Sequence, residues 1–193
     1  MKFTQIPTTA MEEMQLNAGV LLSNFTPSTA EVSGIIGATT GGIKFSATPT
    51  YSDFGEDIDN CPKNMMEFKR QDSIEVKISG TFVTVTTAVA KKLMAAADIG
   101  TSDQTKITPR NDLKTADFAD LWWVGDYSDK NGATNGGFVA IHVMNALNTG
   151  GFQLQSGDKS KGQFAFEFTG HYSIDAQDVV PYEVYIKAGT AEG

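Results

Sequence analysis

The residues best suited to chemistry or ion binding lie between Thr48 and Gln71, where the charged side chains are grouped by sign along the chain. Acidic residues come first and basic residues follow: Asp53, Glu56, Asp57 and Asp59, then Lys63, Lys69 and Arg70. Asp57 and Asp59 have the alternate spacing of a calcium-binding loop. Counted from Asp57, however, Pro62 stands where such a loop needs glycine, and Phe68 where it needs a bidentate glutamate. We therefore expect no metal and interpret these residues as a solvated or interface charge run.

Glycine and histidine patterns that suggest catalysis lack the neighbours that catalysis requires. Gly37 and Gly42 have the spacing of a phosphate-binding loop, but Ile43 occupies the lysine position and Phe45 the magnesium-binding hydroxyl position. No serine motif of the nucleophile-elbow type accompanies the two histidines, His142 and His171.

A thiol nucleophile would have to be Cys61, the single cysteine, with a histidine that is distant in sequence. Cys61 lies in an acidic stretch, and nearby negative charge disfavours the thiolate that a nucleophile requires. We therefore expect that the chain is not an enzyme and has no catalytic residue and no cofactor.

Adjacent Trp122 and Trp123 would point to opposite faces of a strand. One of them could form a sugar-stacking platform, or one could lie in the core and the other at a subunit contact.

Composition restricts the partners that the chain can have. The 193 residues include 15 Lys and Arg against 23 Asp and Glu, so the formal net charge is −8. Tight wrapping of nucleic acid needs clustered cations, which this balance does not favour. We see no secretory leader and no run of the ~20 apolar residues that a membrane span needs. We therefore expect a single domain over residues 1–193, without a membrane and made in a cytoplasm.

Most of the chain has the alternating pattern of strands with one buried face. The clearest cases are residues 72–85, 163–168 and 182–186, and weaker ones lie near 16–25, 34–47, 105–108, 117–124 and 137–147. Gly80 interrupts the first of these and indicates a bulge or bend. One amphipathic helix is predicted at about residues 87–98, with Thr86 or Thr87 as its N-cap. The predicted class is mainly β: a sandwich or partial barrel of antiparallel strands with one flanking helix.

Two connections are unusual for such a fold. Residues 48–71 form a 24-residue link whose apolar residues are too frequent for a free loop, so we expect another surface to cover it. Residues 126–137 (DYSDKNGATNGG) contain two Asn-Gly pairs and predict an exposed, turn-rich loop.

Residues 34–99 also carry a resemblance to a known family. Gly41-Gly42-Ile43, the run from Asp53 to Asn60 leading to Pro62-Lys63-Asn64, and Ser79-Gly80-Thr81-Phe82 before the helix resemble the major tail protein, or tail tube protein, of long-tailed bacteriophages. The resemblance covers about a third of the chain and rests on compositional motifs.

The resemblance implies a structural subunit of the virion tail, assembled in the host bacterial cytoplasm. Six copies would close into a ring, and rings would stack into a hollow tube that conducts DNA without binding it specifically. The chain itself is then the main partner, together with the tail terminator, tape measure and distal tail proteins. The alternative is a β-sandwich module that binds carbohydrate or protein.

Two further expectations follow if the chain forms such a tube. The charges of residues 48–71 would make this segment a stacking arm, pairing either with its counterpart or with the helix lysines Lys91 and Lys92. An acidic lumen would repel DNA phosphates and keep passage fast. Glu75 and Glu167 lie on the polar faces of alternating strands and are the lumen-facing candidates, although Lys77 shares the face of Glu75.

Overall fold

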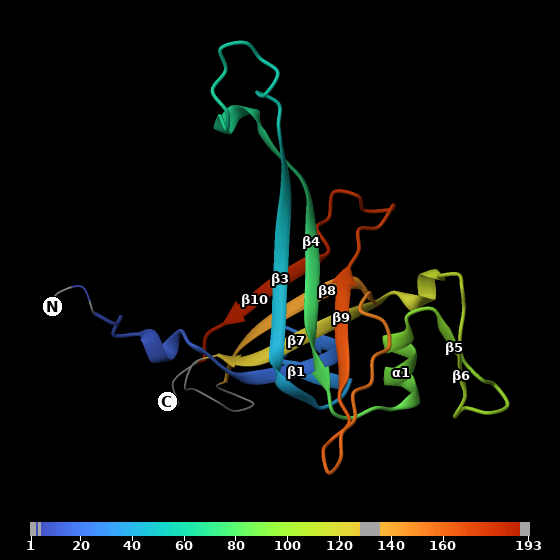
Figure 1. Ribbon diagram of the computed structural model, residues 1–193. Coiled ribbons are helices and arrows are strands. Elements are labelled where there is room, and N and C mark those ends of the chain that lie inside the picture. The colour runs from blue at the N-terminus through green and yellow to red at the C-terminus, as the bar shows by residue number, and fades with distance from the viewer. Residues whose placement is uncertain (1–2, 4, 128–135, 190–193) are drawn as a thin grey trace.

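The computed structural model describes residues 3, 5–127 and 136–189, and these form mainly antiparallel strands with one α-helix (Figure 1). The strands are β1 (Gln15–Thr26), β2 (Glu31–Ile35), β3 (Thr39–Asp53), β4 (Lys69–Phe82), β5 (Ala97–Ile99), β6 (Ile107–Pro109), β7 (Ala119–Tyr127), β8 (Gly137–Asn148), β9 (Phe164–Gly170) and β10 (Tyr182–Lys187). The helical elements are α1 (Thr87–Met94) and three 3-10 turns, η1 (Ala10–Glu12), η2 (Met66–Phe68) and η3 (Thr115–Asp117). The predicted class, mainly β with one flanking helix, is confirmed.

Eight of the strands belong to one antiparallel sheet in the order β2-β1-β7-β8-β9-β4-β3, with β10 added on β8. β5 and β6 form a small separate sheet. In Figure 1 the half made of β9, β4 and β3 crosses in front of the half made of β1, β7, β8 and β10. Among the described strands this sheet remains open, with β2 and β3 at the ends of its order.

The core lies between the two halves of the sheet and follows the alternation of the sequence. Val76, Ile78 and Phe82 of β4 are fully buried, and the phenylalanines of β9 point to the same side. The other half contributes Leu21, Leu121 and Val143, and α1 adds Val89 and Leu93. Because burying each such side chain contributes about 1.5–3 kcal/mol, this shared cluster is what holds the halves face to face.

Gly80 of β4 stands opposite Phe166 of β9 in register. A side chain on Gly80 would place its Cβ 2.8 Å from the Phe166 ring, so glycine is required for this contact. On the neighbouring strand the register shifts between Thr40 and Ile43, opposite Gly80. Gly41 and Gly42 there have positive φ values of 75° and 81°. The bulge is therefore real, although its extra residues lie on β3.

Helix α1 begins where the sequence predicts but ends four residues early. Thr86 is its N-cap, and its hydroxyl accepts a hydrogen bond from the Val89 amide at 3.2 Å. Ala95 then adopts a left-handed φ of 59°, which stops the helix. Residues 97–99 instead form β5, where Asp98 binds Arg110 at 2.8 Å.

The two unusual connections differ in how much of each the structure describes. The predicted link at 48–71 is shorter than expected, because β3 and β4 stay paired from Thr48↔Glu75 out to Asp53↔Lys69. Only residues 54–68 connect them, and η2 lies within this stretch. The predicted loop at 126–137 falls largely on residues 128–135, which lie outside the described residues.

Asn148 stands at the seam between the two halves of the sheet and is the buried polar residue of the described core. Its amide nitrogen donates to the Leu93 carbonyl at the end of α1 (2.6 Å) and to the Gly151 carbonyl (2.9 Å). Its carbonyl oxygen accepts from the Glu167 amide of β9 at 2.9 Å. One side chain therefore ties β8, β9 and the helix together, with its hydrogen-bonding groups nearly all satisfied.

We predict that Asn148→Ala lowers the free energy of unfolding by about 2–4 kcal/mol, because one buried and two partly buried backbone groups lose their partner. Asn148→Asp keeps the shape but cannot donate to either carbonyl, so it is also destabilising. Asn24→Ala, on the exposed side of β1, is the matched control and changes stability by less than about 0.5 kcal/mol. Urea unfolding followed by circular dichroism measures all three, and a loss no larger than the control's would contradict the seam role.

Candidate functional site

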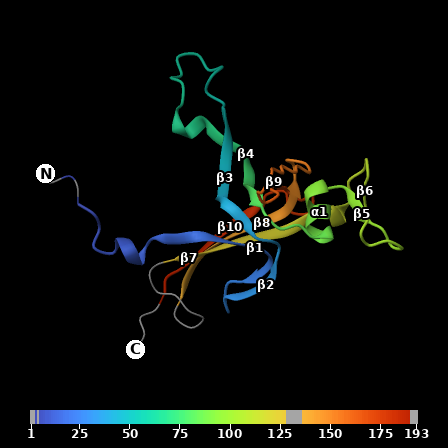
Figure 2. The ribbon, with the colours of Figure 1, turned by 60° about the horizontal axis from the view of Figure 1, so that its bottom comes forward.

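The most conspicuous feature of the surface is the β3–β4 ribbon, which extends well beyond the body of the molecule (Figure 1). Residues 54–68, called here the hairpin tip, form its far end. Figure 2 shows the same projection from a second direction. Because paired strands are stiffer than a free loop, the sequence segment predicted as an arm is held out from the body.

Asp53 fixes the backbone of the hairpin tip. Its two carboxylate oxygens accept hydrogen bonds from the Gly55 amide (3.0 Å) and from the Asn64 amide (2.9 Å). These bonds favour the charged form, so the pKa of Asp53 lies below its usual 3.8. Across the ribbon, the Phe54 amide donates to the Phe68 carbonyl at 3.0 Å. Asp53 is thus a structural residue of the tip.

The remaining predicted charges divide between the tip and the first residues of β4. Glu56 forms a long ion pair with Lys63 at 3.9 Å, and Lys69 donates to the Asn64 side chain at 2.7 Å. Arg70 is exposed on β4, next to Ser52 in register. Asp57 and Asp59 are exposed, and among the described residues neither has an ion-pair partner. The structure brings all seven residues to one end of the ribbon.

Large apolar side chains accompany these charges. Tyr51, Phe54, Ile58, Met65 and Met66 are all exposed, with Met66 at 82% and Phe54 at 60%. Hydrophobic side chains clustered in this way on a soluble surface are typical of an interaction site. The tip therefore has the composition of a contact surface that is uncovered in a single chain.

The two lumen candidates lie together on the polar face of β4 and β9. Lys77 binds Glu75 at 2.8 Å and Glu167 at 3.8 Å, so one lysine bridges both carboxylates. Its hydrogen bond to Glu75 raises the pKa of Lys77. This face is consequently a mixed ion cluster with one net negative charge, less acidic than two isolated glutamates.

The tryptophans do not form an exposed platform. Trp122 is 7% exposed and stacks on His142, with ring centroids 4.0 Å apart and planes 6° from parallel. Trp123 packs against the core, and its indole nitrogen donates to the Ala18 carbonyl at 2.9 Å. Trp122 is thus covered, whereas Trp123 is half-buried and lines a hollow beside Gln15, Asn17 and Ile43.

The structure does not assemble the thiol dyad either. Cys61 lies in the hairpin tip, with its sulfur 3.5 Å from that of Met65. His142 lies on β8 between Asp120 (3.1 Å) and Glu183 (3.6 Å), and His171 bonds the Asn145 carbonyl at 3.1 Å. In the described part of the chain, no group of three or more His, Cys, Asp or Glu is placed to hold a metal ion.

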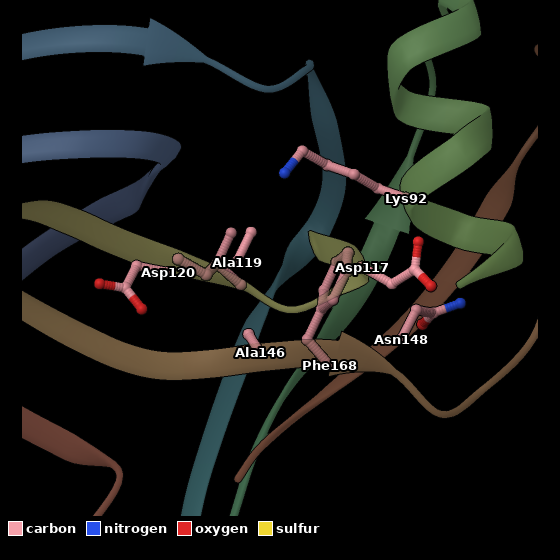
Figure 3. Close-up of a pocket in the computed structure, with 8 residues that line it drawn as sticks. Lys92, Asp117, Ala119, Asp120, Ala146, Asn148 and Phe168 are labelled. Atoms are coloured by element: carbon pink, nitrogen blue, oxygen red, sulfur yellow. The ribbon is translucent and has the colours of Figure 1, made fainter. Parts of the chain in front are cut away.

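Figure 3 shows a small cavity at the seam, lined by Lys92, Asp117, Asp120 and Asn148 among others. Its volume of ≈ 20 Å³ holds about one water molecule. A wider hollow of ≈ 420 Å³ lies beside Phe118, His171 and Ile174, but it is shallow and open. No helix within the described residues has the length and apolar character to span a membrane.

One role at the tip was not assigned from sequence. From the sequence, Asp53 is grouped with the other charges, whereas its carboxylate binds the backbone. Asp53-Phe54-Gly55 has the spacing of an Asx turn, which is the sequence signal for this role.

Comparison of the chain with protein-family models and with curated proteins finds no match. The fold and the surfaces described above are therefore the basis for any functional assignment.

We predict that Asp53→Ala loosens the tip without unfolding the body, because the substitution removes both acceptors. Amide exchange at Gly55 and Asn64 becomes faster, while the melting temperature changes little. Asp57→Ala is the control, since that carboxylate bonds nothing among the described residues. Unchanged exchange in Asp53→Ala would contradict the role.

A pH titration tests the same contact in the unmodified protein. Because the pKa of Asp53 is lowered on folding, its contribution to tip stability is complete above pH 3.8 and is lost as the pH falls through the lower folded value. The amide chemical shifts of Gly55 and Asn64 should therefore titrate together with a midpoint below 3.8. Separate midpoints, or one above that value, would contradict the assignment.

Proposed function

We propose that the chain is a structural subunit of a phage tail tube, which self-assembles into rings that stack into a hollow tube conducting DNA. The observation that carries the proposal is the β3–β4 ribbon, which holds an apolar and charged tip away from the body. In a monomer such a surface is a liability, whereas in a stacked assembly it is buried. The resemblance of residues 34–99 to tail tube proteins supports the same function.

Sheet edges supply a second support for this function. All five residues of β2 are exposed, and β3 lies at the other end of the strand order. Edges of this kind pair readily with strands of another chain. In a closed ring each subunit covers the edge of its neighbour, so that no edge remains free. A ring of six is the number that the resemblance implies.

The remaining partners follow from the role in the tail. The tail terminator, tape measure and distal tail proteins would contact the ends and the lumen of the tube, and the protein would reside in the virion. DNA would pass without specific binding, which suits a net charge of −8. No enzyme activity, cofactor or metal is part of this proposal.

Negative-stain electron microscopy of the purified protein at low and high concentration tests the proposal. We expect rings or hollow tubes, with matching large species in sedimentation velocity. A variant in which Asn-Gly replaces residues 54–68 should form rings but no tubes, because the paired strands and the core remain while the tip is lost. Long tubes from that variant would show that the tip is not the stacking element, and a chain that stays monomeric under all conditions would contradict the tube function.

The lumen assignment has its own test in phage particles that carry Glu75 variants. Glu75→Lys places a second cation beside Lys77 and removes local repulsion of DNA, so we expect ejection to slow by up to about tenfold. Glu75→Gln should have an intermediate effect. Ejection rates are measured by dye-labelled DNA release, with the melting temperature of each tube as the folding control. Equal rates in all three particles would place Glu75 away from the lumen.

A further inference from the structure

The last turn of α1 carries two adjacent cations, Lys91 and Lys92, that are half-buried. Burial lowers the pKa of Lys92, and the charge of Lys91 lowers it further. Within residues 5–127 and 136–189, no carboxylate lies within ion-pair distance of either amino group. Figure 3 shows the Lys92 amino group pointing away from Asp117 across the cavity at the seam. A poorly solvated ammonium of this kind is stabilised by an acidic partner.

The hairpin tip presents carboxylates whose charge is complementary to these lysines. Asp53 is occupied by backbone amides and Glu56 by Lys63. Glu67 in η2 forms no ion pair in the described structure, and neither do Asp57 and Asp59 in the turn. Ile58 between them is 47% exposed, and Phe54 lies close in sequence. The contact that these residues offer is an acidic pair around an apolar centre.

The two surfaces lie far apart on one molecule. Figures 1 and 2 both place the hairpin tip and α1 at different ends, so the tip does not reach its own helix. Other cations near the helix are already engaged: Arg110 binds Asp98 and Asp117, and Lys114 lies 3.6 Å from Asp98. Lys91 and Lys92 are the cations on α1 and form no ion pair in the described residues, although Lys91 is close enough to Asp117 to help lower the pKa of that carboxylate.

We propose that Asp57 and Asp59 in the hairpin tip of one copy bind Lys91 and Lys92 on α1 of a second copy. This inference rests on the proposed function and names the receptor for the tip. Because the two surfaces differ and lie at different ends, each copy binds one neighbour through its tip and another through its helix. Tip-to-tip pairing, the other arrangement that the charge order allows, would use the same surface on both copies and end after two copies.

Carbodiimide crosslinking tests the contact directly, because it joins a carboxylate to an amine only when the two touch. A mixture of ¹⁴N-labelled and ¹⁵N-labelled protein identifies crosslinks between copies by mass spectrometry. We expect hybrid peptides joining residues 54–68 to the segment with Lys91 and Lys92, with a yield that falls several-fold at high salt. Lys91→Gln with Lys92→Gln removes the two amines that would react, so the loss of these hybrid peptides in that variant assigns the crosslinks to this pair.

The outcomes separate this inference from the function on which it rests. Tubes without these hybrid peptides would overturn the inference and leave the tube function standing. Hybrid peptides without rings or tubes would support the contact and contradict the tube function. A monomer without hybrid peptides would overturn both.

Charge reversal gives an independent readout. We expect Asp57→Lys with Asp59→Lys, and Lys91→Glu with Lys92→Glu, each to shorten tubes severalfold, and the fourfold variant to restore their length. Lys106→Glu with Lys161→Glu, at two exposed sites outside α1, is the control. Two results would overturn the proposal. One is tubes of full length when only the tip pair or only the helix pair is reversed. The other is restored length when the reversed tip pair is combined with the control substitutions at Lys106 and Lys161.

Discussion

Strand β8 carries the constraint on which the rest of the fold depends, since it pairs within both halves of the described sheet. Its residues 138–143 lie beside β10, and two residues at its end pair with β9. Such a short join is weak by itself. Asn148 reinforces it by accepting a hydrogen bond from the Glu167 amide of β9 while donating to the end of α1, and the shared core holds the halves together. Without this seam the two halves would be separate sheets with exposed apolar faces.

The seam also explains how a long ribbon can project without collapsing. Along β4, buried residues alternate from Val76 to Phe82, whereas residues from Lys69 to Ser73 are all exposed. The core therefore anchors only the base of the ribbon. Beyond it, cross-strand hydrogen bonds and the Asp53 contacts keep the shape. A rigid apolar tip costs less conformational entropy on binding than a mobile one.

The sequence was informative where one face of a strand is buried, because burial imposes a period of two that the residues must follow. Most described strands were predicted near their observed positions on this basis. β2 and β5 were missed, since β2 has no buried face and β5 follows a helix stop at Ala95 that composition does not encode. The role of Asn148 at the seam between the two halves of the sheet could not be predicted either, because its hydrogen-bond partners belong to β9 and α1, which are distant in the chain.

Charge pairing within the chain decides which charges remain available for other contacts. Lys77 bridges Glu75 and Glu167, and Arg110 bridges Asp98 and Asp117, so these groups are largely satisfied internally. Among the charges without an ion pair in the described residues, Asp57 and Asp59 lie at the tip and Lys91 and Lys92 lie on α1, at different ends of the molecule. A contact between two unlike surfaces leaves one of each kind free at the ends of every assembly. Each added copy then creates the site for the next one, which is the condition for a filament to grow rather than to close as a dimer.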